Sequence, residues 1–152
     1  YIKRDNIKRL LEGVLMKEGL IKIRPDKEKA MSLVKMVSVT LDMIKTIDAE
    51  KFPSNIIKEY YDVIRELISA ILIIDGYKTV GEKAHKKLIK YQELNYKQLS
   101  AYEIFLIDDL RITRNKIAYD GFFVREDYVN RIVDDILKII SRLQRIIDEK
   151  LK

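Results

Sequence analysis

The chain of 152 residues contains no cysteine, no tryptophan and a single histidine, His85. Without cysteine it can form neither a disulfide framework nor a zinc site built on thiolates. One histidine excludes the metal motifs that need two, and it leaves no Cys–His pair for nucleophilic catalysis. We therefore expect no metal ion and no cofactor.

The sequence also lacks a hydrophobic run long enough to cross a membrane. Its longest apolar stretch covers residues 67–74 and is interrupted only by Ser69, whereas a transmembrane helix needs about 20 apolar residues. No signal-peptide pattern opens the chain. These observations predict a cytoplasmic protein that has no membrane partner.

Length and charge limit the possibilities further. A chain of this size can bury most of its apolar surface in one domain, so we predict a single domain over residues 1–152. The 30 basic and 24 acidic residues give a net charge of +6, which permits a nucleic acid partner without requiring one. The abundance of Lys, Glu and Ile is typical of thermophilic proteins and bears only on stability.

Apolar residues recur at spacings of three and four almost throughout, which predicts helices. The expected helices cover residues from about 5 to 13, 25 to 47, 53 to 76, 82 to 92, 100 to 120 and 126 to 151. The third is apolar over more than half of its circumference and should be central. Ser100 and Glu103 have the spacing of a capping box, and Gly76 and Gly121 are typical helix ends. We predict an all-α, up-and-down bundle of five or six helices.

Arg114 breaks the apolar pattern of the fifth helix. Counted at 100° per residue, the apolar stripe of this helix contains Ile107, Leu110, Ile117 and Ala118. Arg114 falls within that stripe, where burial of an unpaired guanidinium would be costly. It therefore requires an acidic partner, a polar network or a cleft that an anion can enter, and the sequence leaves these possibilities open.

Residues 114–121, Arg-Asn-Lys-Ile-Ala-Tyr-Asp-Gly, resemble the signature of the HEPN domains. The family motif is Arg, usually a polar residue, a short and mostly apolar run, and then His. Here Tyr119 stands at the position of the His. Residues 60–66 and 74–85 resemble the long second-hairpin helix and the following turn of that family, so the resemblance extends roughly from Ser54 to the C-terminus. It implies an HEPN-like helical bundle.

The resemblance also implies a dimer and a chemistry. In the ribonuclease members, Arg and His line a cleft between two symmetric subunits, and RNA is cleaved without metal by attack of the 2′-hydroxyl on its own phosphate. Arg114 could stabilise the developing charge. Tyr119 is poorly suited to the proton transfer, because a free phenol has a pKa of about 10, and losing such a group costs roughly 10²- to 10⁴-fold in rate.

We therefore favour a noncatalytic, homodimeric module that binds RNA, nucleotide or a partner nucleotidyltransferase through an inter-subunit cleft around Arg114. The alternative is a weak, metal-independent, toxin-like endoribonuclease that uses Arg114 and Tyr119. Some HEPN toxins of toxin–antitoxin pairs are modified by a nucleotidyltransferase on a tyrosine two places after the motif His. That position is Gly121 here, so such a modification would have to use Tyr119.

Four residues of the fifth helix are the predicted ligand-binding set: Arg111, Arg114, Asn115 and Tyr119. The two arginines are three residues apart, so both can reach one phosphate-sized group. The C-terminal end of a helix carries partial negative charge, which disfavours anions, so Asp108 or Glu66 could instead pair with the arginines.

Three further expectations concern the surroundings of this set. Lys83, Lys87 and Lys90 follow one side of the fourth helix, and we interpret them as a solvated face in preference to a phosphate track. His85 is expected at the surface. A symmetric homodimer should place Ile107, Leu110 and Arg114 near its interface.

Overall fold

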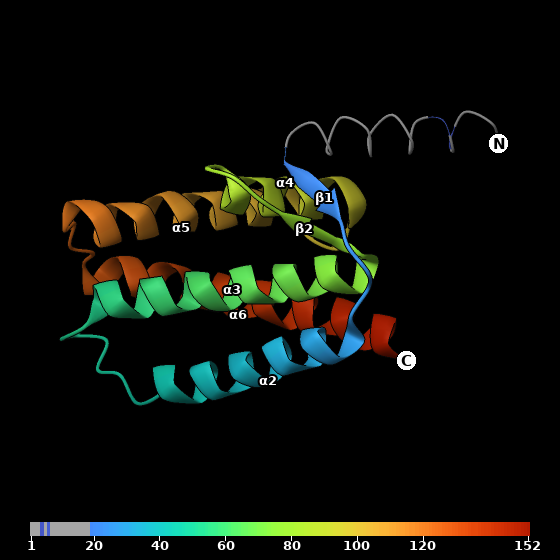
Figure 1. Cartoon of the computed structure of the whole chain (residues 1–152). Helices are drawn as coiled ribbons and strands as arrows, with labels where there is room; N and C mark the ends of the chain where they lie inside the picture. Colours follow the sequence, from blue (N-terminus) through green and yellow to red (C-terminus); the bar gives the residue numbers. More distant parts are fainter. Residues whose placement is uncertain (1–3, 5, 7–18) are drawn as a thin grey trace.

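The computed structural model describes residues 4, 6 and 19–152 of the chain. In this part the elements are β1 (Leu20–Lys22), α2 (Lys27–Ile44), α3 (Pro53–Asp75), β2 (Tyr77–Thr79), α4 (Ala84–Asn95), α5 (Ala101–Asp120) and α6 (Glu126–Leu151). Figure 1 shows the long helices lying side by side, with α4 and α5 on one side of α3 and α2 on the other. The predicted all-α bundle is confirmed as a mostly helical fold. The helix predicted from about Asp5 to Gly13 lies almost wholly outside the described residues.

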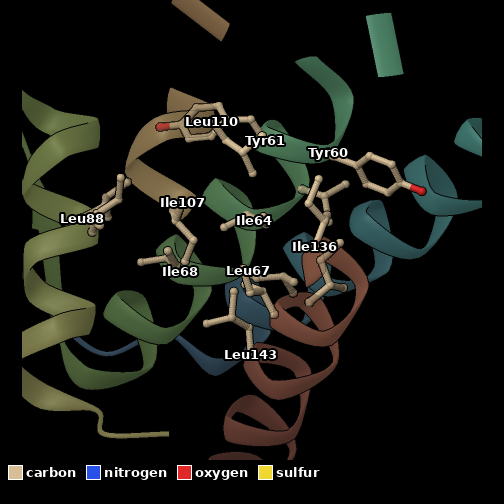
Figure 2. Close-up of a cluster of buried hydrophobic side chains, with 14 of the residues drawn as sticks. Tyr60, Tyr61, Ile64, Leu67, Ile68, Leu88, Ile107, Leu110, Ile136 and Leu143 are labelled. Atoms are coloured by element: carbon tan, nitrogen blue, oxygen red, sulfur yellow. The ribbon is translucent and has the colours of Figure 1, made fainter. Parts of the chain in front are cut away.

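Helix α3 is the centre of the bundle, as its apolar circumference predicted. Twelve of its 23 residues are buried, and it contacts α2, α4, α5 and α6. Figure 2 shows how its side chains meet those of three other helices in one core: Leu88 of α4, Ile107 and Leu110 of α5, and Ile136 and Leu143 of α6. Burial of this many large apolar side chains is the main stabilising contribution to the fold.

Local signals determine where α3 and α5 begin and end. Helix α3 begins at Pro53 and ends before Gly76, whose φ of 88° is left-handed and is easily adopted only by glycine. Helix α5 begins with the predicted capping box, in which the Glu103 backbone N–H donates to Ser100 Oγ and the Ser100 N–H donates to Glu103 Oε1. It ends before Gly121, which has a φ of 64°. These predicted helix ends are confirmed.

The segment predicted as a simple turn after α3 contains a strand. β2 pairs antiparallel with β1, with Leu20 opposite Thr79 and Lys22 opposite Tyr77. Three-residue strands are too short to show a period of two, and the pairing joins residues far apart in the sequence. The spacing of apolar residues therefore could not predict these strands. Helix α4 consequently begins at Ala84, two residues later than expected, and continues to Asn95.

Candidate functional site

A pocket of about 400 Å³ opens between the start of α4 and the C-terminal half of α5. It is lined by Gly81, Glu82, Lys83, Ala84, His85, Lys86, Arg111, Arg114, Asn115 and Tyr119. The structure thus brings together all four residues of the predicted ligand-binding set. Arg114 and Asn115 are three and four residues after Arg111, and Tyr119 is four residues after Asn115, so all four lie on one broad side of α5.

The two arginines enter this pocket from partly buried positions, and each has a carboxylate beside it. Arg111 Nε donates a hydrogen bond to Asp108 Oδ1 at 2.8 Å, the pairing that the sequence suggested. Arg114 Nε lies 3.8 Å from Asp62 Oδ1 on α3, so its partner is not Glu66. That distance is too long for a hydrogen bond. Within the described residues, the terminal guanidinium nitrogens of both arginines donate no hydrogen bond and are available to a ligand.

Beneath the pocket, α3 contributes a loosely paired group of charges. Arg65 Nε lies 3.7 Å from Asp62 Oδ1, and Arg65 Nη2 lies 4.0 Å from Glu66 Oε1. In the part of the chain that the structure describes, one buried atom each of Asp62, Arg65, Glu66 and Arg114 has no hydrogen-bond partner. Burial raises the pKa of Glu66 above its usual value. The charges therefore compensate one another without hydrogen bonds that would hold Arg114 in place.

His85 is more buried than the sequence predicted. It was expected at the surface, but it is half-buried and lines the pocket together with Arg114. Its ring centroid lies 6.2 Å from that of Tyr61 on α3. Burial, followed by the positive charges of Arg65 and Arg114, lowers the pKa of His85 below its usual value. The imidazole is therefore neutral at neutral pH.

Tyr61 lies behind His85, in the core. It is 1% exposed, and Figure 2 shows it next to Leu110 in the core. Burial raises its pKa to about 12, against the opposing effects of Arg65 and Arg111. The phenol consequently stays protonated and adds no charge to the site.

A larger groove of about 800 Å³ lies along the junction of α4 and α5. Lys83, Lys86, Lys87 and Lys90 line it, with Glu93 and Asp108 as the acidic members. Lys83 and Lys86 line both the groove and the arginine pocket. The lysines that we had interpreted as a solvated face therefore border a groove that continues the pocket, and Lys86, which the predicted stripe omitted, belongs to it.

Part of the predicted dimer interface is contradicted by burial. Ile107 and Leu110 are 0% exposed within a single chain, because they pack into the core against α3 (Figure 2). They are not available to a second copy. The exposed large apolar residues of α5 are instead Tyr102, Phe105, Ile112 and Tyr119, at 54%, 67%, 40% and 78% exposure.

Among the described residues, no group of three or more His, Asp or Glu side chains is placed to hold a metal ion. No described helix is both long enough and apolar enough to span a membrane. Comparison of the chain with family models, with curated proteins and with solved structures found no match. The function is therefore inferred from the geometry of the pocket and the groove.

Proposed function

We propose that the chain is an HEPN-like, noncatalytic helical module that binds RNA through the arginine pocket and the adjoining lysine groove. One observation carries the proposal. Arg111 and Arg114, whose terminal nitrogens donate no hydrogen bond to the described residues, share a pocket with two lysines at the start of α4. That pocket continues into a groove with further lysines. Guanidinium groups match the geometry of phosphate oxygens, while lysines attract phosphates as point charges.

The electrostatics of the pocket favour an anion. Four basic side chains line it against one acidic side chain, that of Glu82. The amino-terminal end of α4 also opens onto it and adds partial positive charge from its backbone N–H groups. This contribution opposes the partial negative charge at the C-terminal end of α5, which was the main objection to anion binding.

The groove favours RNA over a single nucleotide. A mononucleotide phosphate needs only the pocket, whereas a chain of phosphodiesters can follow the row from Lys83 to Lys90. Each neutralised phosphate of a single strand releases counterions and adds about 0.7 to the slope of log affinity against log salt. A slope steeper than one or two phosphate contacts can produce would therefore show that the RNA lies along the groove.

We further propose that the module is a symmetric homodimer. Phe105, Ile112 and Tyr119 recur every seven residues along α5 and are exposed, which is the spacing at which one helix face can meet its symmetry mate. Tyr119 lies at the rim of the pocket, so this pairing would bring two arginine pockets to one cleft. The HEPN resemblance also allows a nucleotidyltransferase partner, although Gly121 stands at the usual acceptor position.

A second candidate function, metal-independent RNA cleavage, is favoured by His85. The predicted pair of Arg114 and Tyr119 lacks a group that transfers protons near neutral pH, and a neutral imidazole lies in the same pocket. Such a group is what general base catalysis requires. Cleavage of RNA in the presence of chelator, abolished by Arg114→Ala, would establish this function and refute the noncatalytic proposal.

The binding proposal is tested with a fluorescent 2′-O-methyl oligouridylate, which cannot be cleaved through its 2′-oxygen. Replacing Arg111 and Arg114 with alanine should weaken binding by at least about tenfold, because charge-assisted hydrogen bonds to phosphate are lost. The matched control replaces two exposed lysines with alanine, Lys35 of α2 and Lys45 just after it. It removes the same amount of charge. Equal affinities for the two double variants would show that the arginines are structural.

A further inference from the structure

We propose that His85 is a further anion-binding residue of the pocket and that it takes up a proton when a phosphate group binds beside Arg114. Binding then consumes one proton, and affinity depends on pH. This inference rests on the proposed anion-binding function.

The geometry places His85 among charges from three parts of the fold. It is the second residue of α4 and lines the same pocket as the two arginines of α5. The titratable and charged groups around it are Tyr61, Asp62 and Arg65 of α3, Arg111 and Arg114 of α5, and Glu82, Lys83 and Lys86 beside it in the chain. Positive side chains predominate in this set.

Without a ligand, these surroundings keep the imidazole neutral. Burial and the charges of Arg65, Arg114 and Arg111 lower the pKa of His85, and only Asp62 acts in the opposite direction. A neutral imidazole has one N–H donor and one acceptor nitrogen, so it can donate at most one hydrogen bond to a phosphate.

A bound phosphate changes this balance. Its negative charge offsets the arginines and attracts a positive imidazolium, so the pKa of His85 rises in the complex. The imidazolium has two N–H donors, one of which can bind the ligand while the other faces the protein. By linkage, each unit by which binding raises the pKa corresponds to tenfold tighter binding at low pH than at high pH.

The probe is the same 2′-O-methyl oligouridylate, because neither its phosphodiesters nor its bases titrate between pH 5.5 and 8. Affinity is measured across that range for the wild-type protein and for His85→Gln, which keeps a hydrogen-bonding side chain but cannot be protonated. We expect the wild-type affinity to rise more than that of the variant as pH falls, by up to about tenfold for a one-unit rise in pKa. Glu66, whose pKa is also raised, is unchanged in both proteins, so the comparison isolates His85.

A direct measurement uses the fact that the chain has a single histidine. Its imidazole Cε1 proton therefore gives one NMR resonance that needs no assignment, and its titration gives the pKa with and without saturating oligonucleotide. The expected result is a higher midpoint in the complex by about one unit. Because this experiment uses the wild-type protein, it decides the question even if His85→Gln fails to fold.

The outcomes separate the two proposals. Binding that depends on the arginines, with identical midpoints in the free and bound protein, would overturn the inference and leave the anion site intact. A pH dependence of the same size in His85→Gln would also overturn it. Absence of binding at every pH would refute the proposed function itself.

Discussion

Asp62→Asn tests whether Arg114 is a structural ion or a ligand-binding one. The substitution keeps the shape of the side chain and removes the negative charge that lies 3.8 Å from Arg114 and 3.7 Å from Arg65. If Arg114 serves mainly to pair with Asp62, the variant should be destabilised. If Arg114 is held ready for an anion, the variant should bind anions more tightly, since the competing carboxylate is gone.

The expected magnitudes differ clearly between the two hypotheses. A phosphate on the outer side of Arg114 would lie roughly 7 Å from Asp62, and removing that repulsion is worth about 0.6 to 2.4 kcal/mol for effective dielectric constants of about 80 to 20. This corresponds to about 3- to 50-fold tighter binding. The stability cost should be below about 2 kcal/mol, because the two side chains keep 21% and 27% exposure and lack hydrogen-bond geometry, which places the pair between exposed and fully buried ion pairs.

Oligonucleotide affinity and thermal unfolding of Asp62→Asn are both measured at pH 7.5, where His85 is neutral. Asp42→Asn is the matched control, because Asp42 of α2 lies outside the pocket and forms an exposed ion pair, at 3.7 Å, with Lys45 just after the helix. Its affinity should equal that of the wild-type protein. A fall of more than about 6 °C in the melting temperature of Asp62→Asn would correspond to about 2 kcal/mol of lost stability. Such a fall, together with unchanged or weaker binding, would refute the anion-site reasoning.

Two further predictions concern stability. Gln92 is 0% exposed, and neither polar atom of its amide has a hydrogen-bond partner in the described residues. Gln92→Met should therefore stabilise the protein by about 1 to 2 kcal/mol and raise the melting temperature by several degrees. An unchanged or lower melting temperature would contradict this. The folded-state pKa of His85 lies below its unfolded value of 6.5, so the stability present above pH 6.5 is lost as pH falls through the folded-state pKa. Chemical denaturation should show a smaller loss from pH 7.5 to 5.5 in His85→Gln, and parallel curves would contradict the assignment.

Features encoded by neighbouring residues were predictable from the sequence. The capping box at Ser100 and Glu103, the left-handed glycines at 76 and 121 and the central position of α3 all follow from local patterns. The shared face of Arg111, Arg114, Asn115 and Tyr119 is likewise a property of helix geometry alone. These predictions needed no knowledge of how the helices pack.

Features that depend on packing were not predictable. His85 lines the pocket because the start of α4 lies against the C-terminal half of α5, a contact that has no periodic signal in the sequence. Arg114 pairs with Asp62 and not with Glu66, which lies about one turn further along the same face of α3, because the packing of the two helices sets which turn of α3 is level with Arg114. Ile107 and Leu110 were expected near a dimer interface because an apolar stripe in the sequence does not reveal whether it faces the core or a second chain.

The charge balance around the pocket reconciles the salt-bridge and anion-site interpretations of Arg114. The partly buried charges at the α3–α5 contact are Arg65, Arg111 and Arg114 with Asp62, Glu66 and Asp108, so the cluster is neutral before any ligand binds. Neutrality allows it to be buried next to the core without a large desolvation penalty. An incoming phosphate adds a negative charge at the point where the guanidinium nitrogens are free, and a proton on His85 restores the balance. Asp62 then acts as an internal counterion whose role a bound phosphate can take over, which is why its removal should tighten binding.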